Sequence, residues 1–278
     1  MKRFLLHLSM LALALTPFVA HAAGGAFEIN QDCIAVGCFV GDAAGYPVTI
    51  TQPGTYVLTS DLAPSGNQFI ETIIVTAAPV DIDLNGHTIE GGATCSGTPV
   101  TAACTGFTGY TGIAMSHGGV LGNFHVHNGR IHGFRNAGIL ASDSASGSSF
   151  EQLVLSENAF GIGVSGAAGT DAGHIRDCQI VRNSTTGVTA SAGSRSRTFV
   201  ENSTISGNQF FGLYLGSGSV VTGSRINDNG QVGIDCTALA CALGQNTFQG
   251  NAGGPSAQYA VGTLKDMGGN VCLDHVCP

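Results

Sequence analysis

Leu155-Ser-Glu-Asn158, Ile180-Val-Arg-Asn183, Ile205-Ser-Gly-Asn208 and Ile226-Asn-Asp-Asn229 are copies of one short pattern spaced 21 to 25 residues apart, and Phe248-Gln-Gly-Asn251 is a further copy. A glycine and an aliphatic residue follow all but the last: Gly161-Ile162, Gly187-Val188, Gly212-Leu213 and Gly233-Ile234. The series opens at Ile131, where Phe134 replaces the asparagine, and Leu84-Asn-Gly-His-Thr-Ile89 looks like an earlier copy. A period of this length indicates one supersecondary unit per repeat, stacked on its neighbours.

The residues within each unit are typical of strands and turns, because apolar and β-branched runs are broken by Gly, Asn and Ser. Counted from the repeated aliphatic residue, position minus five holds Val126, Phe150, Ile175, Val200 and Val221, and position minus two holds Gly129, Leu153, Cys178, Ser203 and Ser224. Side chains two residues apart share one face of a strand, so such columns are expected inside the stack. We predict an all-β parallel β-helix, a solenoid of about seven to nine coils.

Two further columns have expected roles. The asparagine at plus three is expected at a turn, because Asn accepts left-handed backbone geometry and its amide can bond the same amide one coil away. Position minus four reads His127, Glu151, Arg176 and Glu201. Opposite charges on neighbouring coils predict a ladder of exposed ion pairs, each worth about 0–1 kcal/mol.

The repeat resembles the right-handed parallel β-helix of the pectate-lyase-like superfamily over roughly residues 80–251, and Ile50-Thr-Gln-Pro-Gly-Thr-Tyr-Val-Leu-Thr59 resembles the leading strand of bacterial members. The superfamily includes polysaccharide lyases, hydrolases, epimerases, tailspikes, adhesins and periplasmic metal-maturation proteins, so the resemblance implies a fold and leaves the activity open. The chain lacks the Asp-Pro-His-Glu run of alginate epimerases and the clustered Asp pair with Arg-x-Lys of polygalacturonases.

The N-terminus has the pattern of a cleavable secretory signal over residues 1–22: a basic start, an apolar run from Phe4 to Ala20, and Ala20-His-Ala22 before the cleavage point. We therefore expect a secreted or periplasmic protein without a membrane span. Residues 23–278 are expected to form one β-helix domain. It would have an N-terminal cap and leading strands (23–79), coils (80–251) with an insertion at 93–112, and a C-terminal cap or tail (252–278).

The net charge of the chain limits the classes of partner that it can bind. The formal net charge is −8, and charged residues are 10% of the chain. This balance argues against a nucleic-acid partner, and long-range repulsion opposes an acidic polysaccharide unless a local basic patch exists. A polysaccharide is the expected partner, and the oligomeric state is left open.

Eight of the nine cysteines fall into close pairs. In an exported chain these predict four local disulfides, Cys33–Cys38, Cys95–Cys104, Cys236–Cys241 and Cys272–Cys277. A zinc site is the alternative, but none of these pairs has Cys-x-x-Cys spacing. Cys178 is left over and lies in the interior minus-two column, so it is expected to be a buried, inert thiol.

The densest group of ionisable residues is Phe124-His-Val-His-Asn-Gly-Arg-Ile-His-Gly-Phe-Arg135. Alternation about Val126 and Ile131 turns the flanking histidines and arginines outward, and the group follows the 93–112 insertion, which we expect it to adjoin. Resemblance to β-helix lyases implies proton abstraction beside a uronate carboxylate, with Ca²⁺ or another cation neutralising the acid. On that interpretation Arg130, Arg135 and His132 are the candidate catalytic residues, with an arginine holding the carboxylate and His132 as base.

The candidate ligand-binding residues are His125, His127, Asp81 and Asp83. The two aspartates alternate about Ile82 and share a face. Paired carboxylates can act as acid and base or bind calcium, although hydrogen bonds to a neighbouring turn would equally explain them. The leading hypothesis is binding, with lyase-like processing, of an extracellular or cell-wall polysaccharide. The alternatives are a non-catalytic, adhesin-like surface scaffold, and a periplasmic metal-binding protein using His125, His127 and His132.

Overall fold

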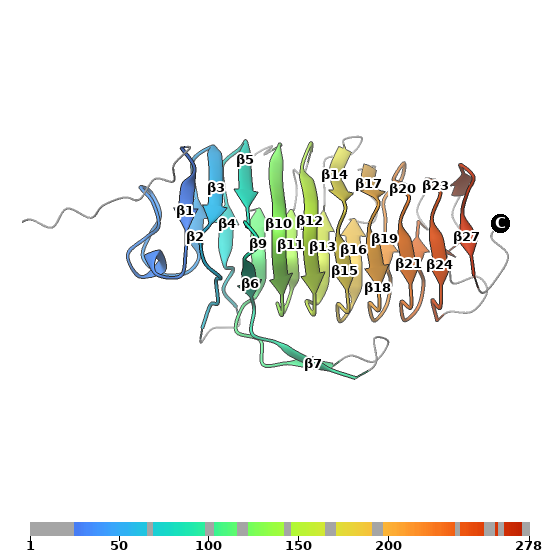
Figure 1. The fold of residues 1–278 in the computed structure, drawn as a ribbon, viewed down its shortest axis with the longest axis horizontal. Helices are drawn as coiled ribbons and strands as arrows, with labels where there is room; N and C mark the ends of the chain where they lie inside the picture. The colour runs from blue at the N-terminus through green and yellow to red at the C-terminus, as the bar shows by residue number, and fades with distance from the viewer. Residues whose placement is uncertain are drawn as a thin grey trace, which may run out of the picture.

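The computed structural model describes residues 25–65, 69–97, 103–115, 122–141, 146–164, 171–190, 197–236, 240–252, 259–260 and 264–273. Over these ranges the chain is β-structure apart from one 3-10 turn, η1 (Cys33–Ala35). It coils into a rod of about eight turns, with parallel strand pairing from coil to coil (Figure 1). The predicted right-handed parallel β-helix is therefore confirmed. No helix in these ranges is long and apolar enough to cross a membrane.

Two long sheets run along the rod. The 16-stranded sheet contains β1 (Phe27–Ile29), β3 (Gly54–Leu58), β5 (Val80–Asp83), β6 (Thr88–Glu90), β10 (Phe124–His132), β12 (Ser149–Ser156), β14 (Asp171–Arg176), β15 (Gln179–Val181), β17 (Arg197–Glu201), β18 (Thr204–Ser206), β20 (Val220–Thr222), β21 (Arg225–Asn227), β23 (Cys241–Gly244), β24 (Thr247–Gln249), β26 (Leu264–Asp266) and β27 (Val271–Cys272). The 9-stranded sheet contains β2 (Val48–Ile50), β4 (Ile73–Val75), β9 (Thr111–Met115), β11 (Ala137–Ala141), β13 (Phe160–Val164), β16 (Thr186–Ala190), β19 (Leu213–Tyr214), β22 (Ile234–Asp235) and β25 (Tyr259–Ala260).

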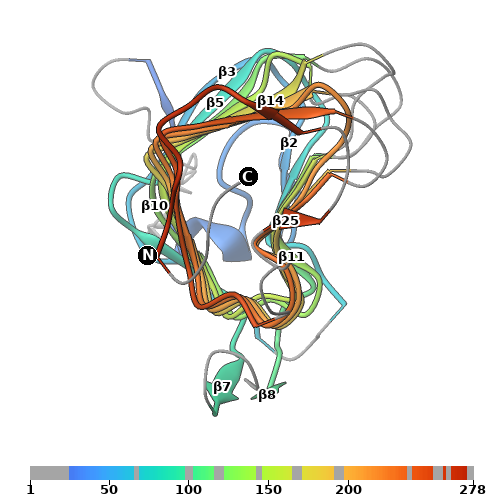
Figure 2. The ribbon, with the colours of Figure 1, turned by 90° about the vertical axis from the view of Figure 1, so that its right-hand side faces the viewer.

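Within each coil of the larger sheet the chain bends partway along the strand direction. This bend divides the coil into a first and a second half. The bend falls at residues with left-handed backbone, among them Asn128 (φ 60°), Gln152 (φ 53°) and Asp177 (φ 54°). In the view down the rod, β5 and β14 lie on one side, and the chain turns a corner before the second half of the coil (Figure 2). Outward side chains before and after this bend therefore face different directions.

The interior is built from the columns that the repeat predicted. The zero column pairs from coil to coil in unbroken register, and each member is at most 1% exposed: Ile131, Leu155, Ile180, Ile205, Ile226 and Phe248. The minus-five column is equally buried, with Val126 paired to Phe150 and onward to Val221. Removing these aliphatic side chains from water, at about 25 cal/mol per Å², is the main stabilising contribution of each added coil.

A ladder of buried asparagine amides runs through the turn after the second half of each coil. Its members are Asn158, Asn183, Asn208, Asn229 and Asn251. From Asn183 onward, each Oδ1 accepts the backbone N–H and the Nδ2–H of the preceding asparagine at 2.9–3.3 Å. Oδ1 of Asn158, the first member, accepts the backbone N–H of Phe134. The stacking prediction is confirmed, but the left-handed residue is the one before the asparagine, such as Glu157 (φ 60°) and Arg182 (φ 56°). That residue turns the chain so that the amide points inward.

The glycine after each asparagine is required by close packing between coils. A Cβ on Gly187 would lie 2.6 Å from the carbonyl oxygen of Gly212 and 2.9 Å from Nδ2 of Asn208. A Cβ on Gly161 would lie 2.5 Å from the carbonyl oxygen of Gly187. Only a residue without a side chain lets the turns stack at this spacing.

Three of the four predicted disulfides are present: Cys33–Cys38, Cys95–Cys104 and Cys236–Cys241. Cys272 is also disulfide-bonded, while its expected partner Cys277 lies outside the described residues, as does the predicted signal at residues 1–22. Such bonds form in oxidising compartments, so they fit an extracellular or periplasmic protein.

The insertion and the unpaired cysteine also follow the prediction. Cys95–Cys104 closes an antiparallel hairpin, β7 (Thr94–Ser96) with β8 (Ala103–Thr105), which projects from the rod (Figure 1). Cys178 is a free, buried thiol in the minus-two column. Burial raises the pKa of this thiol to about 12.

Candidate functional site

Two neighbouring columns of outward side chains run along the first half of the coils. Strands β5, β10, β12 and β17 alternate buried and outward residues before the bend. The strand register places Asp81, His125, Ser149, His174 and Phe199 in one column, and Asp83, His127, Glu151, Arg176 and Glu201 in the next. These ten residues, from β5 to β17, are called the polar face below.

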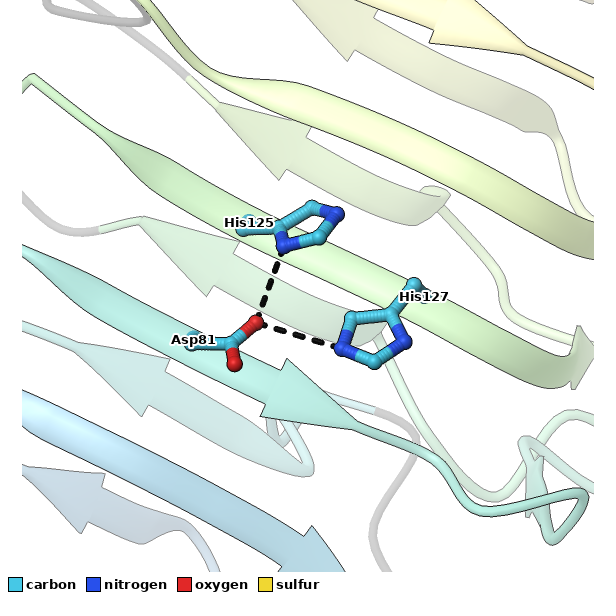
Figure 3. Close-up of side chains that lie close together, drawn as sticks. All are labelled: Asp81, His125 and His127. Atoms are coloured by element: carbon cyan, nitrogen blue, oxygen red, sulfur yellow. Dashed lines mark ion pairs between the residues drawn. The ribbon is translucent and has the colours of Figure 1, made fainter.

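A cluster of one aspartate and two histidines lies at the start of the polar face (Figure 3). Oδ1 of Asp81 is 2.9 Å from Nδ1 of His125 and 3.2 Å from Nε2 of His127. The two imidazole rings stack, with centroids 4.5 Å apart and an interplanar angle of 25°. One ligand atom from each residue lies within 4.8 Å of the others, which is true of no other His, Cys, Asp or Glu trio among the described residues.

Two further carboxylates flank the histidines. Oδ1 of Asp83 is 3.7 Å from Nδ1 of His127, and Oε1 of Glu151 is 4.0 Å from Nε2 of His125. Glu151 is held from the next coil by Arg176, whose Nη2 lies 2.8 Å from Oε2 of the carboxylate. This hydrogen bond raises the pKa of the Arg176 guanidinium above its usual value.

A shallow groove adjoins the cluster on the polar face. It is lined by the outward side chains of Ser149, Glu151, His174, Arg176, Phe199 and Glu201. His174 and Phe199 stack almost in parallel, with ring centroids 4.6 Å apart at 10°. Ser149, which has the smallest side chain of its column, lies between His125 and His174, and Ser149 and His174 both line the groove. The groove thus combines aromatic, acidic and basic groups.

The sequence model of the family described as "Right handed beta helix region" matches residues 81–219 and 111–265. Together these matches cover more than half of the 278-residue chain and include the whole polar face. The chain belongs to this family. No curated protein sequence matches this β-helix protein.

Solved structures with a similar fold include three proteins that act in different settings. Pectate lyase Pel9A has 14% identity and a TM-score of 0.45, with 89% of this chain and 72% of that chain covered. Tailspike protein 2 of an Escherichia coli O157:H7 bacteriophage has 14% identity and a TM-score of 0.44, covering 81% and 37%. The A-module of the Azotobacter vinelandii mannuronan C-5 epimerase AlgE6 has 14% identity and a TM-score of 0.42, covering 91% and 89%. At this identity none of the similarities indicates an activity for this β-helix protein.

The predicted catalytic residues are not gathered with the ligand-binding residues. Arg130 and His132 follow the bend at Asn128, and they pair with β6 and with the second half of β12 instead of with β5. Asp81, Asp83, His125 and His127, by contrast, lie together before the bend. The predicted catalytic and ligand-binding residues look like one patch in the sequence. In the β-helix, Arg130 and His132 lie on a different face from the ligand-binding residues. A catalytic role for Arg130 and His132 remains a prediction.

Arg135 lies at a third location, beside the hairpin insertion. Its guanidinium carbon is 5.0 Å from the ring centroid of Phe69, and that ring is 6.5 Å from the ring of Tyr110. The backbone N–H of Arg135 donates to the carbonyl oxygen of Gly109. Figure 2 shows the β7–β8 hairpin on the far side of the rod from β5 and β14. The end of the ionisable group at Gly133 and Arg135 therefore adjoins the insertion as expected. Asp81, His125 and His127 do not share that location, because the chain bends between them and the hairpin.

His174, Phe199 and Ser149 were not among the predicted site residues. The repeat contains the signal for them, because they occupy position minus six, the next outward position on the strand from the charged minus-four column. Reading that column from His125 onward gives a serine between two aromatic rings. A small residue within a column of large outward residues predicts a gap in the protein surface at that position.

The residues of the polar face do not fit calcium, the ion that the lyase resemblance implies. Calcium takes six to eight oxygen ligands, whereas the cluster at the start of this face offers one aspartate oxygen and two imidazole nitrogens. The other nearby carboxylates, Asp83 and Glu151, lie 3.7 Å and 4.0 Å from nitrogens of His127 and His125.

Proposed function

We propose that this exported β-helix protein binds an extracellular or cell-wall polysaccharide, and that a sugar ring sits above Ser149 in the groove of the polar face. The observation that carries the proposal is the gap between His125 and His174, with Phe199 stacked behind His174. Neighbouring strands lie about 4.8 Å apart, so the backbones of the two histidines are about 9.6 Å apart across the serine. Sites for small polar ligands combine such aromatic walls with a few fixed polar groups.

The charges of the groove favour a particular class of sugar. Glu151 and Glu201 accept hydrogen bonds, and Arg176 between them donates. Two carboxylates against one guanidinium leave the groove with net negative charge, and the chain as a whole carries −8. Repulsion therefore opposes polyuronates, and hydroxyl or amino groups suit the carboxylates. The proposed ligand is a neutral or amino-sugar polysaccharide.

A binding screen tests the proposal. Purified protein would be tested against neutral, amino-sugar and uronate polymers by affinity electrophoresis, with calcium or chelator present. Binding to a neutral or amino-sugar polymer, stronger than to any uronate, is the expected result. Binding to none of the polymers would contradict the proposal and favour the non-catalytic scaffold.

Variants locate the binding site. His174→Ala and Phe199→Ala each remove one ring, and each is expected to weaken binding about 5-fold or more. Phe210→Ala is the control, because Phe210 is a 39% exposed aromatic residue outside the groove. Equal losses in all three variants, or none in the first two, would contradict the placement of the ligand.

Catalysis is a separate part of the proposal and has its own readout. The same polymers would be followed for unsaturated products by ultraviolet absorbance, and for reducing ends. If cleavage occurs, Arg130→Ala and Arg135→Ala are expected to slow it, as the sequence hypothesis requires. A wild-type rate in both variants would exclude these arginines from catalysis without affecting the binding proposal.

A further inference from the structure

We infer that Asp81, His125 and His127 form a binding site for a divalent first-row transition-metal ion, of which Zn²⁺ and Cu²⁺ are the test cases. The inference does not rest on the glycan proposal, but the two sites are adjacent: His125 also borders the gap above Ser149, and Glu151 also lines the groove. Three ligands from two adjacent strands, β5 and β10, converge on one point in Figure 3.

The distances fit a shared ion. Zinc binds imidazole nitrogen and carboxylate oxygen at about 2.0–2.2 Å, so ligand atoms around a tetrahedral ion lie about 3.4 Å apart. Oδ1 of Asp81 lies 2.9 Å and 3.2 Å from the nearest nitrogens of His125 and His127, and all three ligand atoms are within 4.8 Å of one another. Side-chain adjustments of a few tenths of an ångström would complete the site.

The hydrogen bonding of the cluster is incomplete without a cation. Oδ1 of Asp81 is enclosed and has no aligned hydrogen-bond donor, although a histidine nitrogen lies only 2.9 Å away. Nε2 of His125 is likewise enclosed and has no hydrogen-bond partner. A metal ion between the aspartate oxygen and the two facing histidine nitrogens would give the enclosed Asp81 oxygen the partner that it lacks.

The outer carboxylates have the arrangement that metal-binding histidines use. A ligating histidine turns its second ring nitrogen toward a carboxylate, which fixes the ring and raises its basicity. Here Nδ1 of His127 lies 3.7 Å from Asp83, and Nε2 of His125 lies 4.0 Å from Glu151. Each histidine therefore has one nitrogen toward Asp81 and the other toward a different carboxylate.

Asp83 is itself held in place by neighbouring polar groups. Its Oδ1 accepts the backbone N–H of Asn85 at 2.7 Å and the side-chain amide of Asn128 at 3.1 Å. Together with the Arg176–Glu151 pair, this fixes both outer carboxylates before any ion binds. A preorganised set of this kind is what separates a site from a chance surface cluster.

The donor set selects the class of metal. Imidazole suits zinc, copper and nickel, whereas calcium and magnesium require oxygen shells. The side chains of the three ligands are 24–39% exposed, so an ion can enter from solvent and keep a water molecule as a further ligand.

Calorimetric titration of tag-free, chelator-treated protein with Zn²⁺, Cu²⁺ and Ca²⁺ tests the inference. We expect one transition-metal ion per chain and no calcium at the site. The His125→Gln/His127→Gln double variant is expected to lose more than about 100-fold in affinity, and Asp83→Asn about 10-fold. His87→Gln is the matched control, because its Nδ1 lies 3.2 Å from Oδ1 of Asp61 without a second histidine in the cluster.

A spectroscopic readout separates ligation from folding. The electron paramagnetic resonance spectrum of the copper-loaded protein should show coupling to two imidazole nitrogens, reduced to one in His127→Gln. Unfolding curves in chelator should be unchanged by these outward-facing substitutions. No stoichiometric binding of either ion, or wild-type affinity in the double variant, would overturn the inference. The glycan screen uses the wild-type protein in chelator, so its result is read independently of metal binding.

Discussion

At the scale of single residues, Cys178 gives a direct test of the interior assignment. Its thiol is 2% exposed, and its Sγ lies 3.3–3.4 Å from the carbonyl oxygens of Arg176 and Phe150. We expect no reaction with an aromatic disulfide reagent at pH 8 in the native protein, and one thiol per chain after unfolding in urea. Rapid labelling of the native protein would contradict the burial.

The same thiol predicts a pH dependence of stability. Burial raises its pKa from the ordinary 9.0 to about 12, so the folded state holds the proton more tightly than the unfolded state. The contribution is therefore fully present below about pH 9 and is lost as pH rises toward 12, by up to about 1.4 kcal/mol per pH unit. Cys178→Ser should lack this loss, and serine fits because Ser203 and Ser224 fill the same column. Urea unfolding at pH 7 and pH 10 compares the two proteins.

The residues of the candidate site were only partly predictable. Alternation along the strand placed His125 and His127 outward on one face, and Asp81 beside Asp83. The pairing of Asp81 with His125 was not predictable, because Asp81 lies eight residues before Ile89 whereas His125 lies six before Ile131, so two extra residues at the first bend shift the register. The separation of Arg130 was missed because a strict alternation does not register the left-handed bend at position 128.

At the scale of elements, the asparagine ladder should dominate the stability of the turn. Asn183 accepts two hydrogen bonds from Asn158 and donates to the carbonyl oxygen of Leu155 and to Asn208. Asn183→Ala leaves these buried groups unpaired, at an expected cost of about 3 kcal/mol or more in the free energy of unfolding. Asn227→Ala is the control, because its Oδ1 has no hydrogen-bond partner. Equal effects in chemical denaturation would contradict the ladder's role.

The glycine column makes a second prediction about the turn. Gly187→Ala places a Cβ 2.6 Å from a backbone oxygen, which has no flexible end to move aside. We expect a loss of about 2–3 kcal/mol, from overpacking. Gly45→Ala, where the backbone is left-handed (φ 96°) but the space is open, should cost only about 1 kcal/mol. Thermal unfolding followed by circular dichroism distinguishes the two variants. An equal decrease in the unfolding temperature would show that the spacing between coils adapts to the added methyl group.

At the scale of the whole molecule, the disulfides should differ in how much they contribute to the free energy of unfolding. Cys95–Cys104 closes a hairpin that projects from the rod, whereas Cys236 and Cys241 are each 1% exposed within the core. Replacing both cysteines of the hairpin by serine should change rod stability by less than about 1 kcal/mol, and replacing the core pair should cost about 2–4 kcal/mol. The reverse order in urea unfolding would mean that the hairpin is part of the cooperative unit.

The whole fold was predictable because every coil repeats the same constraints: interior aliphatics, a buried amide and a glycine. The position of the hairpin around the rod was not, since it depends on how sharply each bend turns the chain. The sequence likewise showed the charge ladder, with Glu151 paired to Arg176 at 2.8 Å. It did not indicate that the ladder borders a groove, which depends on the neighbouring column containing Ser149.

The central claim is that this one face of the rod is its binding surface, and filling the gap above Ser149 tests it most directly. Ser149→Tyr adds a ring between His125 and His174 and leaves both histidines in place, and Ser156→Tyr makes the same replacement on the same strand beyond the bend. Affinity for the polysaccharide found in the screen would be measured by calorimetry for both variants. The account predicts at least about 10-fold weaker binding for Ser149→Tyr and wild-type affinity for Ser156→Tyr. Wild-type affinity in Ser149→Tyr would contradict it.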